Sequence, residues 1–284
     1  PRSTWPSSPD RMPAPPDAET LSLRQAAERL GVHYMTAYRY VRTGMLPAVK
    51  EGTEWRVAAA DLAALSSAET GPARRGNANW SRRLKNRMKA GDERGSWLVV
   101  EAAMAAGLAP ERIYLDVLSP ALREIGEEWN AGTSTIAEEH RASAVAHRLV
   151  GRLGSRFAAR GRPRGRVVVG TPPGERHRLP VAMLADILRA SGFEVIDLGS
   201  DVPIESFVEA VQDATPIAVG ISIAGSAGLE QAADVVAAVK GASGTPVLIG
   251  GPAVEGLEHA ARLGGDGYAA DGAEAAVWLI ERRG

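Results

Sequence analysis

The chain contains no cysteine, few aromatic residues and no long apolar run. The lack of cysteine excludes disulfides, thiolate metal sites, iron–sulfur clusters and thioether-linked chromophores, and it agrees with a reducing cytoplasm. Aromatic residues make up only 5% of the 284 residues, so Ala, Val and Leu must fill the core. No stretch approaches the ~18–20 apolar residues of a membrane span, and the start has no signal-peptide pattern. We therefore expect a soluble, cytoplasmic protein without membrane contacts.

The near-neutral net charge of -1 hides an asymmetry along the chain. Residues 1–90 hold 15 Lys and Arg against 8 Asp and Glu, whereas the remainder holds 18 against 26. A basic front half on an acidic rear half indicates that the front half meets a polyanion.

Residues 20–66 are predicted to form a compact unit after a disordered segment, residues 1–19, that is rich in Pro and Ser. Ser22 and Gln25 fit a capping box at the start of a first helix that ends at Gly31. A second helix, two short strands and a last short helix are expected at His33–Thr43, between Leu46 and Val57, and at Ala59–Leu65. This order is that of a winged helix-turn-helix.

The AAERLGV…TAYRYVRTGMLP segment resembles the DNA-binding domains of the MerR and excisionase-like families. We expect the second helix to read double-stranded operator DNA, with Arg39 in its middle. The predicted DNA contacts are His33, Tyr34, Thr36, Arg39, Tyr40, Arg42, Lys50 and Arg56. One small domain buries too little surface for tight specific binding, so self-association as a dimer or larger oligomer is implied. The alternative is a small protein-binding helical domain with solvated arginines.

A second, helical module is predicted after a flexible linker over residues 67–80. Residues 81–160 are expected to form a four-helix bundle, with helices at Trp97–Ala106, Pro110–Leu118, Pro120–Trp129 and Thr135–Phe157. The loop 130–134 then brings Trp129, Glu139 and His140 to one end of this bundle. The basic run that begins at Arg82 is interpreted as a solvated helix face, and phosphate contacts are the minority alternative.

Residues 161–284 change to alternating strands and helices. Five continuously apolar strands are predicted at Val167–Gly170, Val195–Gly199, Ile217–Ser222, Val247–Gly251 and Gly267–Ala270. The fold class is therefore multidomain α and α/β, ending in a Rossmann-like (flavodoxin-like) domain with a five-stranded parallel sheet. Ligands of such domains bind at the carboxyl ends of the strands, and His177 lies in the loop after the first strand.

The loop around His177, with the sequence GERHRLP, lacks the glycine spacing of a phosphate-binding loop. A His beside a carboxylate suits axial ligation of a metal, and Glu175 is placed to accept the other ring N–H. Gly174 belongs to the same loop. Small residues at the ends of later strands are expected to clear a groove for a long, thin substituent, namely Gly199, Ser222, Gly250 and Gly251.

The run TPPGERH…LG…IS…VLIGG…YAADG resembles the cobalamin-binding domain of corrinoid-dependent methyltransferases and mutases. Their Asp-x-His-x-x-Gly motif corresponds to Glu175-x-His177-x-x-Pro180, so the resemblance implies that His177 is the lower cobalt ligand. The Trp-x9-Glu-His element of the bundle resembles that of the CarH/LitR cobalamin photoreceptor regulators, which also begin with a MerR-like domain. The three resemblances cover about 240 residues in the same order.

This family resemblance implies a cobalamin cofactor, adenosylcobalamin, with Trp129, Glu139 and His140 lining its upper face. It implies a repressor that is a tetramer in the dark and that falls apart when light breaks the Co–C bond. A His that takes the cobalt afterwards is replaced here by Asn130. No catalytic acid–base pair or nucleophile is evident, so we expect no enzyme. The alternatives are a light-independent regulator that senses cobalamin or another tetrapyrrole, and a corrinoid carrier for methyl transfer.

Overall fold

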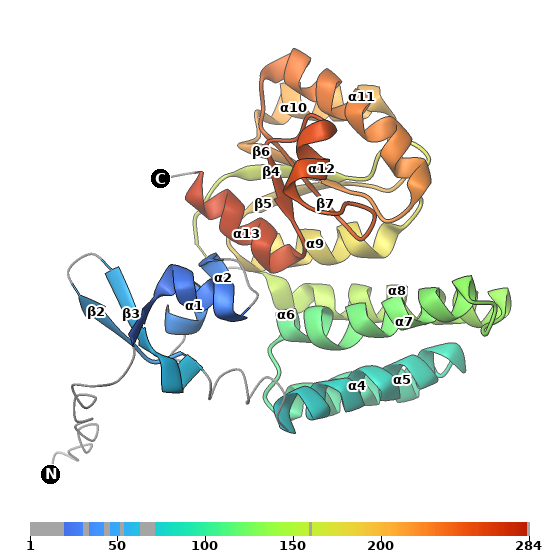
Figure 1. The fold of residues 1–284 in the computed structure, drawn as a ribbon. Helices are drawn as coiled ribbons and strands as arrows, with labels where there is room; N and C mark the ends of the chain where they lie inside the picture. Colours follow the sequence, from blue (N-terminus) through green and yellow to red (C-terminus); the bar gives the residue numbers. More distant parts are fainter. Residues whose placement is uncertain are drawn as a thin grey trace, which may run out of the picture. The chain divides into compact units, whose positions relative to one another are not determined.

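The structure is a computed structural model that describes residues 20–30, 34–42, 46–51, 54–62, 72–158 and 161–282 (Figure 1). The predicted disordered segment 1–19 and His33 lie outside these residues. The chain divides between Gly76 and Asn77 into two compact units, which are described separately. Within the described ranges, no helix has both the length and the apolar character that a membrane crossing requires.

The first unit has the predicted helix, helix and hairpin order. Its elements are β1 (Thr20–Ser22), α1 (Leu23–Leu30), α2 (Tyr34–Arg42), β2 (Ala48–Glu51) and β3 (Glu54–Ala58), and residues 59–62 are helical. The predicted capping box is present, because Gln25 N–H donates to Ser22 Oγ and Ser22 N–H donates to Gln25 Oε1. Strand β1 was not predicted. It pairs antiparallel with β3 and completes a three-stranded sheet in the order β1-β3-β2.

The second unit begins with a helical bundle (Figure 1). Its elements are α4 (Pro72–Lys89), α5 (Glu93–Ala105), α6 (Pro110–Arg112), the π-helix η1 (Ile113–Leu118), α7 (Ser119–Asn130) and α8 (Ile136–Gly154), followed by the 3-10 helix η2 (Ser155–Phe157). Helix α4 starts at Pro72, so the linker prediction does not hold for residues 72–80. Proline is favourable in the first turn of a helix, where its missing N–H has no partner to lose.

The helices predicted at Pro110–Leu118 and Pro120–Trp129 are one continuous helix with a π-helical segment before Pro120. Proline lacks an N–H and its ring crowds the carbonyl four residues back, which normally ends or kinks an α-helix. In the π segment, Ser119 N–H donates to the carbonyl of Tyr114, five residues back. This wider turn lets the helix pass Pro120 without a break.

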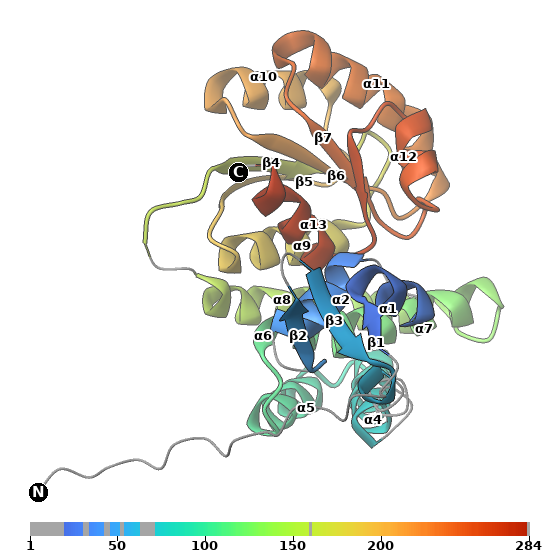
Figure 2. The same cartoon turned by 60° about the vertical axis from the view of Figure 1, so that its left-hand side comes forward.

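The α/β part has a five-stranded parallel sheet in the order β5-β4-β6-β7-β8, so the flavodoxin-like prediction is confirmed. The strands are β4 (Arg166–Gly170), β5 (Glu194–Gly199), β6 (Ala218–Ser222), β7 (Val247–Gly250) and β8 (Gly267–Ala269). The helices are α9 (Arg178–Ala190), α10 (Ile204–Ala214), α11 (Ser226–Ser243), α12 (Leu257–Arg262) and α13 (Gly272–Glu281). Helices α9 and α13 cover one face of the sheet, and α10, α11 and α12 cover the other (Figure 2).

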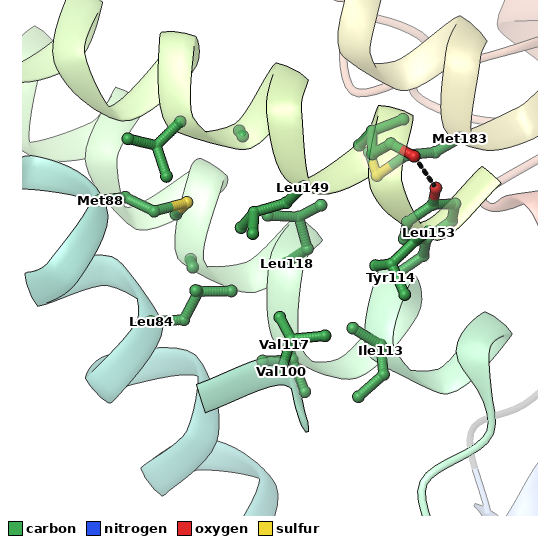
Figure 3. Close-up of a cluster of buried hydrophobic side chains, with 14 of the residues drawn as sticks. Leu84, Met88, Val100, Ile113, Tyr114, Val117, Leu118, Leu149, Leu153 and Met183 are labelled. Carbon is green, nitrogen blue, oxygen red and sulfur yellow. Dashed lines mark hydrogen bonds between the residues drawn. The ribbon is translucent and has the colours of Figure 1, made fainter. Parts of the chain in front are cut away.

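The bundle and the α/β part share one hydrophobic core. Leu179, Met183 and Ile187 of α9 belong to the same buried cluster as Leu149 and Leu153 of α8 (Figure 3). The opposite face of α9 packs on the sheet. Helix α9 therefore lies between the sheet and the bundle, and it begins directly after His177.

One polar contact crosses this shared core. The hydroxyl of the fully buried Tyr114 donates to Asp186 Oδ2 at 2.9 Å, and its ring stacks on Phe157. Asp186 also accepts a hydrogen bond from Arg189 at 3.0 Å. The bundle is thus joined to α9 by a buried hydrogen bond as well as by apolar packing.

Candidate cofactor site

The His177 loop lies at the switch point of the sheet, where the strand order reverses between β4 and its two neighbours. It begins at Thr171 after β4 and ends with His177 at the N-cap position of α9. Ligands of open α/β sheets bind at such points, because the loops on the two sides diverge there. The fold thus places the predicted ligand where a site is expected.

Glu175 is the buried anchor of this loop, with 2% of its surface exposed. Its Oε1 accepts hydrogen bonds from His177 N–H at 2.9 Å and from His177 Nδ1 at 2.5 Å. Its Oε2 accepts from the backbone N–H groups of Ala224 and Gly225, both at 2.7 Å. The predicted contact between Glu175 and the imidazole is therefore present, and the two amides beyond β6 were not foreseen.

These contacts determine the charge state of the pair. Burial by itself would raise the pKa of Glu175, but the hydrogen bonds from His177, Gly225 and Ala224 outweigh it and lower the pKa to about 2. The hydrogen bond to Glu175 raises the pKa of His177 above its usual value, against the lowering effect of burial. Glu175 is thus a carboxylate that holds the proton of His177 on Nδ1 and leaves Nε2 outside the contact.

Two glycines near the start of α11 support this arrangement in different ways. A Cβ on Gly228 would lie 2.9 Å from Glu175 Cβ and 3.0 Å from Ile223 Cγ2, so a side chain there would displace the carboxylate. Gly225 precedes the first turn of α11, where backbone N–H groups and the helix dipole favour an anion. Pro180, which replaces the family's glycine, lies in the first turn of α9, a position that tolerates proline.

The loop backbone is held from the side of β5. Thr171 Oγ1 donates to the carbonyl of Glu175 at 2.6 Å, and Asp201 N–H donates to the same carbonyl at 2.8 Å. Asp201 Oδ1 in turn accepts from Gly174 N–H at 2.7 Å. Asp201 has a positive φ of 56°, which is uncommon for a residue other than glycine. These bonds fix the backbone on which the His177 side chain, 65% exposed, is carried.

Glu139 of helix α8 acts electrostatically on this loop. The charge of Glu139 contributes to raising the pKa of His177, after the effects of the Glu175 hydrogen bond, burial and the Glu175 charge. Glu139 is half-buried and accepts a hydrogen bond from Ser143 one turn later, at 2.6 Å. His140 is exposed, with Nε2 3.5 Å from Glu139, and Trp129 at the end of α7 is 48% exposed.

The α7–α8 turn that carries these residues is tied to α4. Lys85 and Lys89 of α4 each lie 2.6 Å from a carboxylate oxygen of Glu128, the residue before Trp129. Thr135 and Glu138 form a capping box at the start of α8. Two members of the predicted solvated basic face, Lys85 and Lys89, therefore point into the bundle and hold the turn in place.

The predicted groove residues have a structural reason to be small. A Cβ on Gly250 would lie 2.4 Å from the carbonyl of Ala269, and one on Gly251 would lie 2.2 Å from that of Ile223. A Cβ on Gly199 would lie 2.3 Å from the Arg178 guanidinium, a side chain that can move. Ser222 is buried at the end of β6. Close backbone approach thus accounts for Gly250 and Gly251 without a ligand.

The predicted DNA-contact residues are distributed over α2 and the hairpin. Thr36, Arg39 and Arg42 lie on α2, but their side chains are outside the described part. Tyr34 is exposed, whereas Tyr40 is half-buried against the core, so only part of its side chain is accessible. Lys50 is exposed on β2, and Arg56 of β3 lies 3.6 Å from Glu51.

Comparison with known proteins identifies three modules in this order. A helix-turn-helix domain model matches residues 20–66, and two B12 binding domain models match residues 80–153 and 165–277. The HTH-type transcriptional repressor CarH of Myxococcus xanthus is 34% identical over 214 residues, which are 74% of this chain and 67% of that protein. Trimethylamine corrinoid protein 1 of Methanosarcina acetivorans is 30% identical over 128 residues, 44% of this chain and 59% of the relative.

A solved structure supports the fold of the second unit. The monomethylamine corrinoid protein of Methanosarcina barkeri superposes with a TM-score of 0.65 at 20% identity, over 72% of this chain and 99% of that one. A helix-turn-helix module followed by two B12-binding modules defines a cobalamin-binding transcriptional regulator. With the similarity to the Myxococcus protein, the chain belongs to the CarH-type family of these regulators.

Proposed function

We propose that the protein is a light-responsive repressor that binds adenosylcobalamin through His177 and operator DNA as a dark-state oligomer. The main support for cobalt ligation by His177 is the Glu175–His177 pair, in which His177 Nδ1 is hydrogen-bonded to the buried Glu175 carboxylate. A corrin-bound cobalt would take one donor atom from the protein. Neutral imidazole nitrogen is such a donor, and a carboxylate behind it fixes the tautomer and raises its basicity.

The upper face of the cofactor is assigned to the end of the bundle. Glu139 acts electrostatically on His177, which favours a site between α8 and the His177 loop. The large exposed surface of Trp129 leaves an aromatic face free to pack on the ring. We assign Glu139 and His140 to the polar part of the adenosyl group.

Bound adenosylcobalamin supplies a Co–C bond that light can break. The protein residues hold the cofactor and transmit the change. Trp129 and Glu139 would contact the adenosyl group, and loss of that contact would free the bundle to alter the surface used for self-association, a population shift. Asn130 provides no imidazole for the cobalt in the light state.

The helix-turn-helix favours this regulator over a corrinoid carrier, which has no need of a DNA-binding module. In the proposal, Arg39 reads a base in the major groove and Lys50 and Arg56 contact phosphates beside the hairpin.

The test is cobalamin retention and the absorption spectrum of reconstituted protein, with His177→Ala beside a matched His259→Ala control on α12. We expect His177→Ala to lose cobalamin on gel filtration and to lack the spectrum of a His-ligated corrin, whereas the control retains both. An unchanged His177→Ala variant would overturn the ligation. Elution of wild type in the dark and after illumination tests the switch, because identical elution with the adenosyl group lost would leave a light-independent cobalamin regulator.

A further inference from the structure

The segment that joins α8 to β4 is rich in arginine. Residues 148–166 contain seven Arg and no Asp or Glu. This concentration stands out because the rest of the second unit, residues 77–147 and 167–284, holds 16 Lys and Arg against 26 Asp and Glu. A local cationic surface therefore lies on an otherwise acidic module.

Three of these arginines are engaged within the protein. Arg148 forms an ion pair with Glu93, and Arg152 stacks over the Trp97 ring at 3.7 Å. Arg166 lies 3.1 Å from Glu194 and donates to the carbonyl of Ala214. They fasten the segment to the bundle and to the sheet.

Arg162 and Arg164 differ from these three. Both are exposed, and across residues 72–158 and 161–282 their side chains make no hydrogen bond or ion pair. Arg164 N–H donates to the carbonyl of Gly192, and its side chain covers that glycine, whose Cβ would lie 3.3 Å from Arg164 Nε. The backbone is thus ordered while the guanidinium groups are left without a partner.

A third arginine faces the same place. Arg189, in the last turn of α9, lines with Arg162 a hollow of about 190 Å³ whose other walls are Ala158, Gly161, Pro163, Gly192 and Phe193. We call Arg162, Arg164 and Arg189 the arginine surface. The carboxylates of Asp186 and Glu194 are already occupied, since Asp186 is buried and bound by Tyr114 and Arg189, and Glu194 is paired with Arg166.

The arginine surface is separate from the cofactor site. His177 lies at the N-terminus of α9 and Gly192 lies after its C-terminus, and thirteen helical residues separate them by about 20 Å. A ligand at this surface therefore leaves the His177 loop untouched.

We propose that the arginine surface binds the phosphodiester backbone of double-stranded DNA and adds a sequence-independent contact to those of the helix-turn-helix. Guanidinium groups match phosphate oxygens in a bidentate geometry and are more weakly hydrated than ammonium groups. The polyanion that this regulator meets is DNA, and phosphate contacts supply affinity without reading sequence. The inference rests on the DNA-binding role of the chain and is independent of light and of cobalt ligation.

The test is the salt dependence of binding by the full chain to a labelled random-sequence duplex, measured by fluorescence anisotropy. The variant is Arg162→Gln/Arg164→Gln, and the charge-matched control is Arg123→Gln/Arg262→Gln, two exposed arginines on α7 and α12. Each lost phosphate contact lowers the slope of log K against log salt by about 0.9. We expect the slope to fall by about 1 to 2 in the variant and to stay unchanged in the control.

Two further variants separate the alternatives. Arg162→Lys/Arg164→Lys keeps the charge and should retain most of the slope, whereas Arg39→Ala should remove sequence preference and leave the arginine contribution intact. A slope in the Gln variant equal to that of the control would overturn the proposal. So would binding of tripolyphosphate that depends on Arg162 and Arg164 while the DNA slope is unchanged, because the surface would then serve a small phosphate ligand.

Discussion

The hydrogen bond between Tyr114 and Asp186 joins the bundle to the α/β part, and Tyr114→Phe removes it selectively. The hydroxyl is fully buried and donates to a carboxylate at 2.9 Å, and the ring packing on Phe157 would be retained. Burial, followed by the charge of Asp186, raises the pKa of Tyr114, so the hydroxyl remains a donor. Hydrogen bonds to charged groups contribute about 1.5–3 kcal/mol, more than neutral ones.

Asp186 would keep its bond to Arg189, so we expect a loss of about 2 kcal/mol in the unfolding free energy rather than the full cost of an unpaired buried charge. For a unit of this size, that corresponds to a fall in Tm of roughly 4–8 °C.

Urea unfolding followed by circular dichroism measures the change. Tyr268→Phe is the control, because Tyr268 is half-buried and its hydroxyl makes no hydrogen bond to the described residues. If Tyr114→Phe and Tyr268→Phe lower the unfolding free energy by the same small amount, the Tyr114–Asp186 hydrogen bond does not stabilise the packing of the bundle on the α/β part.

Two further predictions concern the α/β part. Gly228→Ala should weaken cobalamin retention, because the added Cβ would press on Glu175. Gly225→Ala should retain cobalamin, because the added Cβ would meet no atom closer than 3.6 Å. The cobalamin content of each variant after gel filtration measures the effect. Asp266 accepts hydrogen bonds from Val247 N–H and from the Lys240 ammonium. Burial would raise the pKa of Asp266, but these hydrogen bonds have the larger effect and lower it below 3.8. Its contribution to stability is present above that pH and is lost as the pH falls below it, so Asp266→Asn should flatten the acid limb of the unfolding free energy against pH.

The sheet was predictable because its central strands β4, β6 and β7 are largely buried. Continuous apolar runs placed all five strands within one residue of their observed starts. Strand β1 was missed since an alternation over only three residues is too short to indicate a strand, and its strand character depends on pairing with β3. Pro120 misled the prediction because a π-helical segment compensates a missing donor, and no local pattern announces such a segment.

Some features of the candidate site could likewise be predicted from the sequence, and others could not. The partnership of Glu175 and His177 could be inferred, since two side chains two residues apart share one loop. The amides of Ala224 and Gly225 could not, because every residue except proline carries an N–H and its direction depends on the fold. Gly228 has a detectable signal, a glycine in the first turn of a helix, but its reason becomes visible only when Glu175 is seen against it.

Predicting the bundle and the α/β part as separate domains missed the role of α9. This helix carries His177 at its start, packs one face on the sheet and the other on α8, and bonds to Tyr114 through Asp186. Glu139 acts on His177 from α8, so both sides of the candidate site belong to one packed body. A change in the contacts of α8 therefore acts directly on α9, the helix that follows His177. For that reason we expect a change at the cofactor to alter the surface of the bundle first.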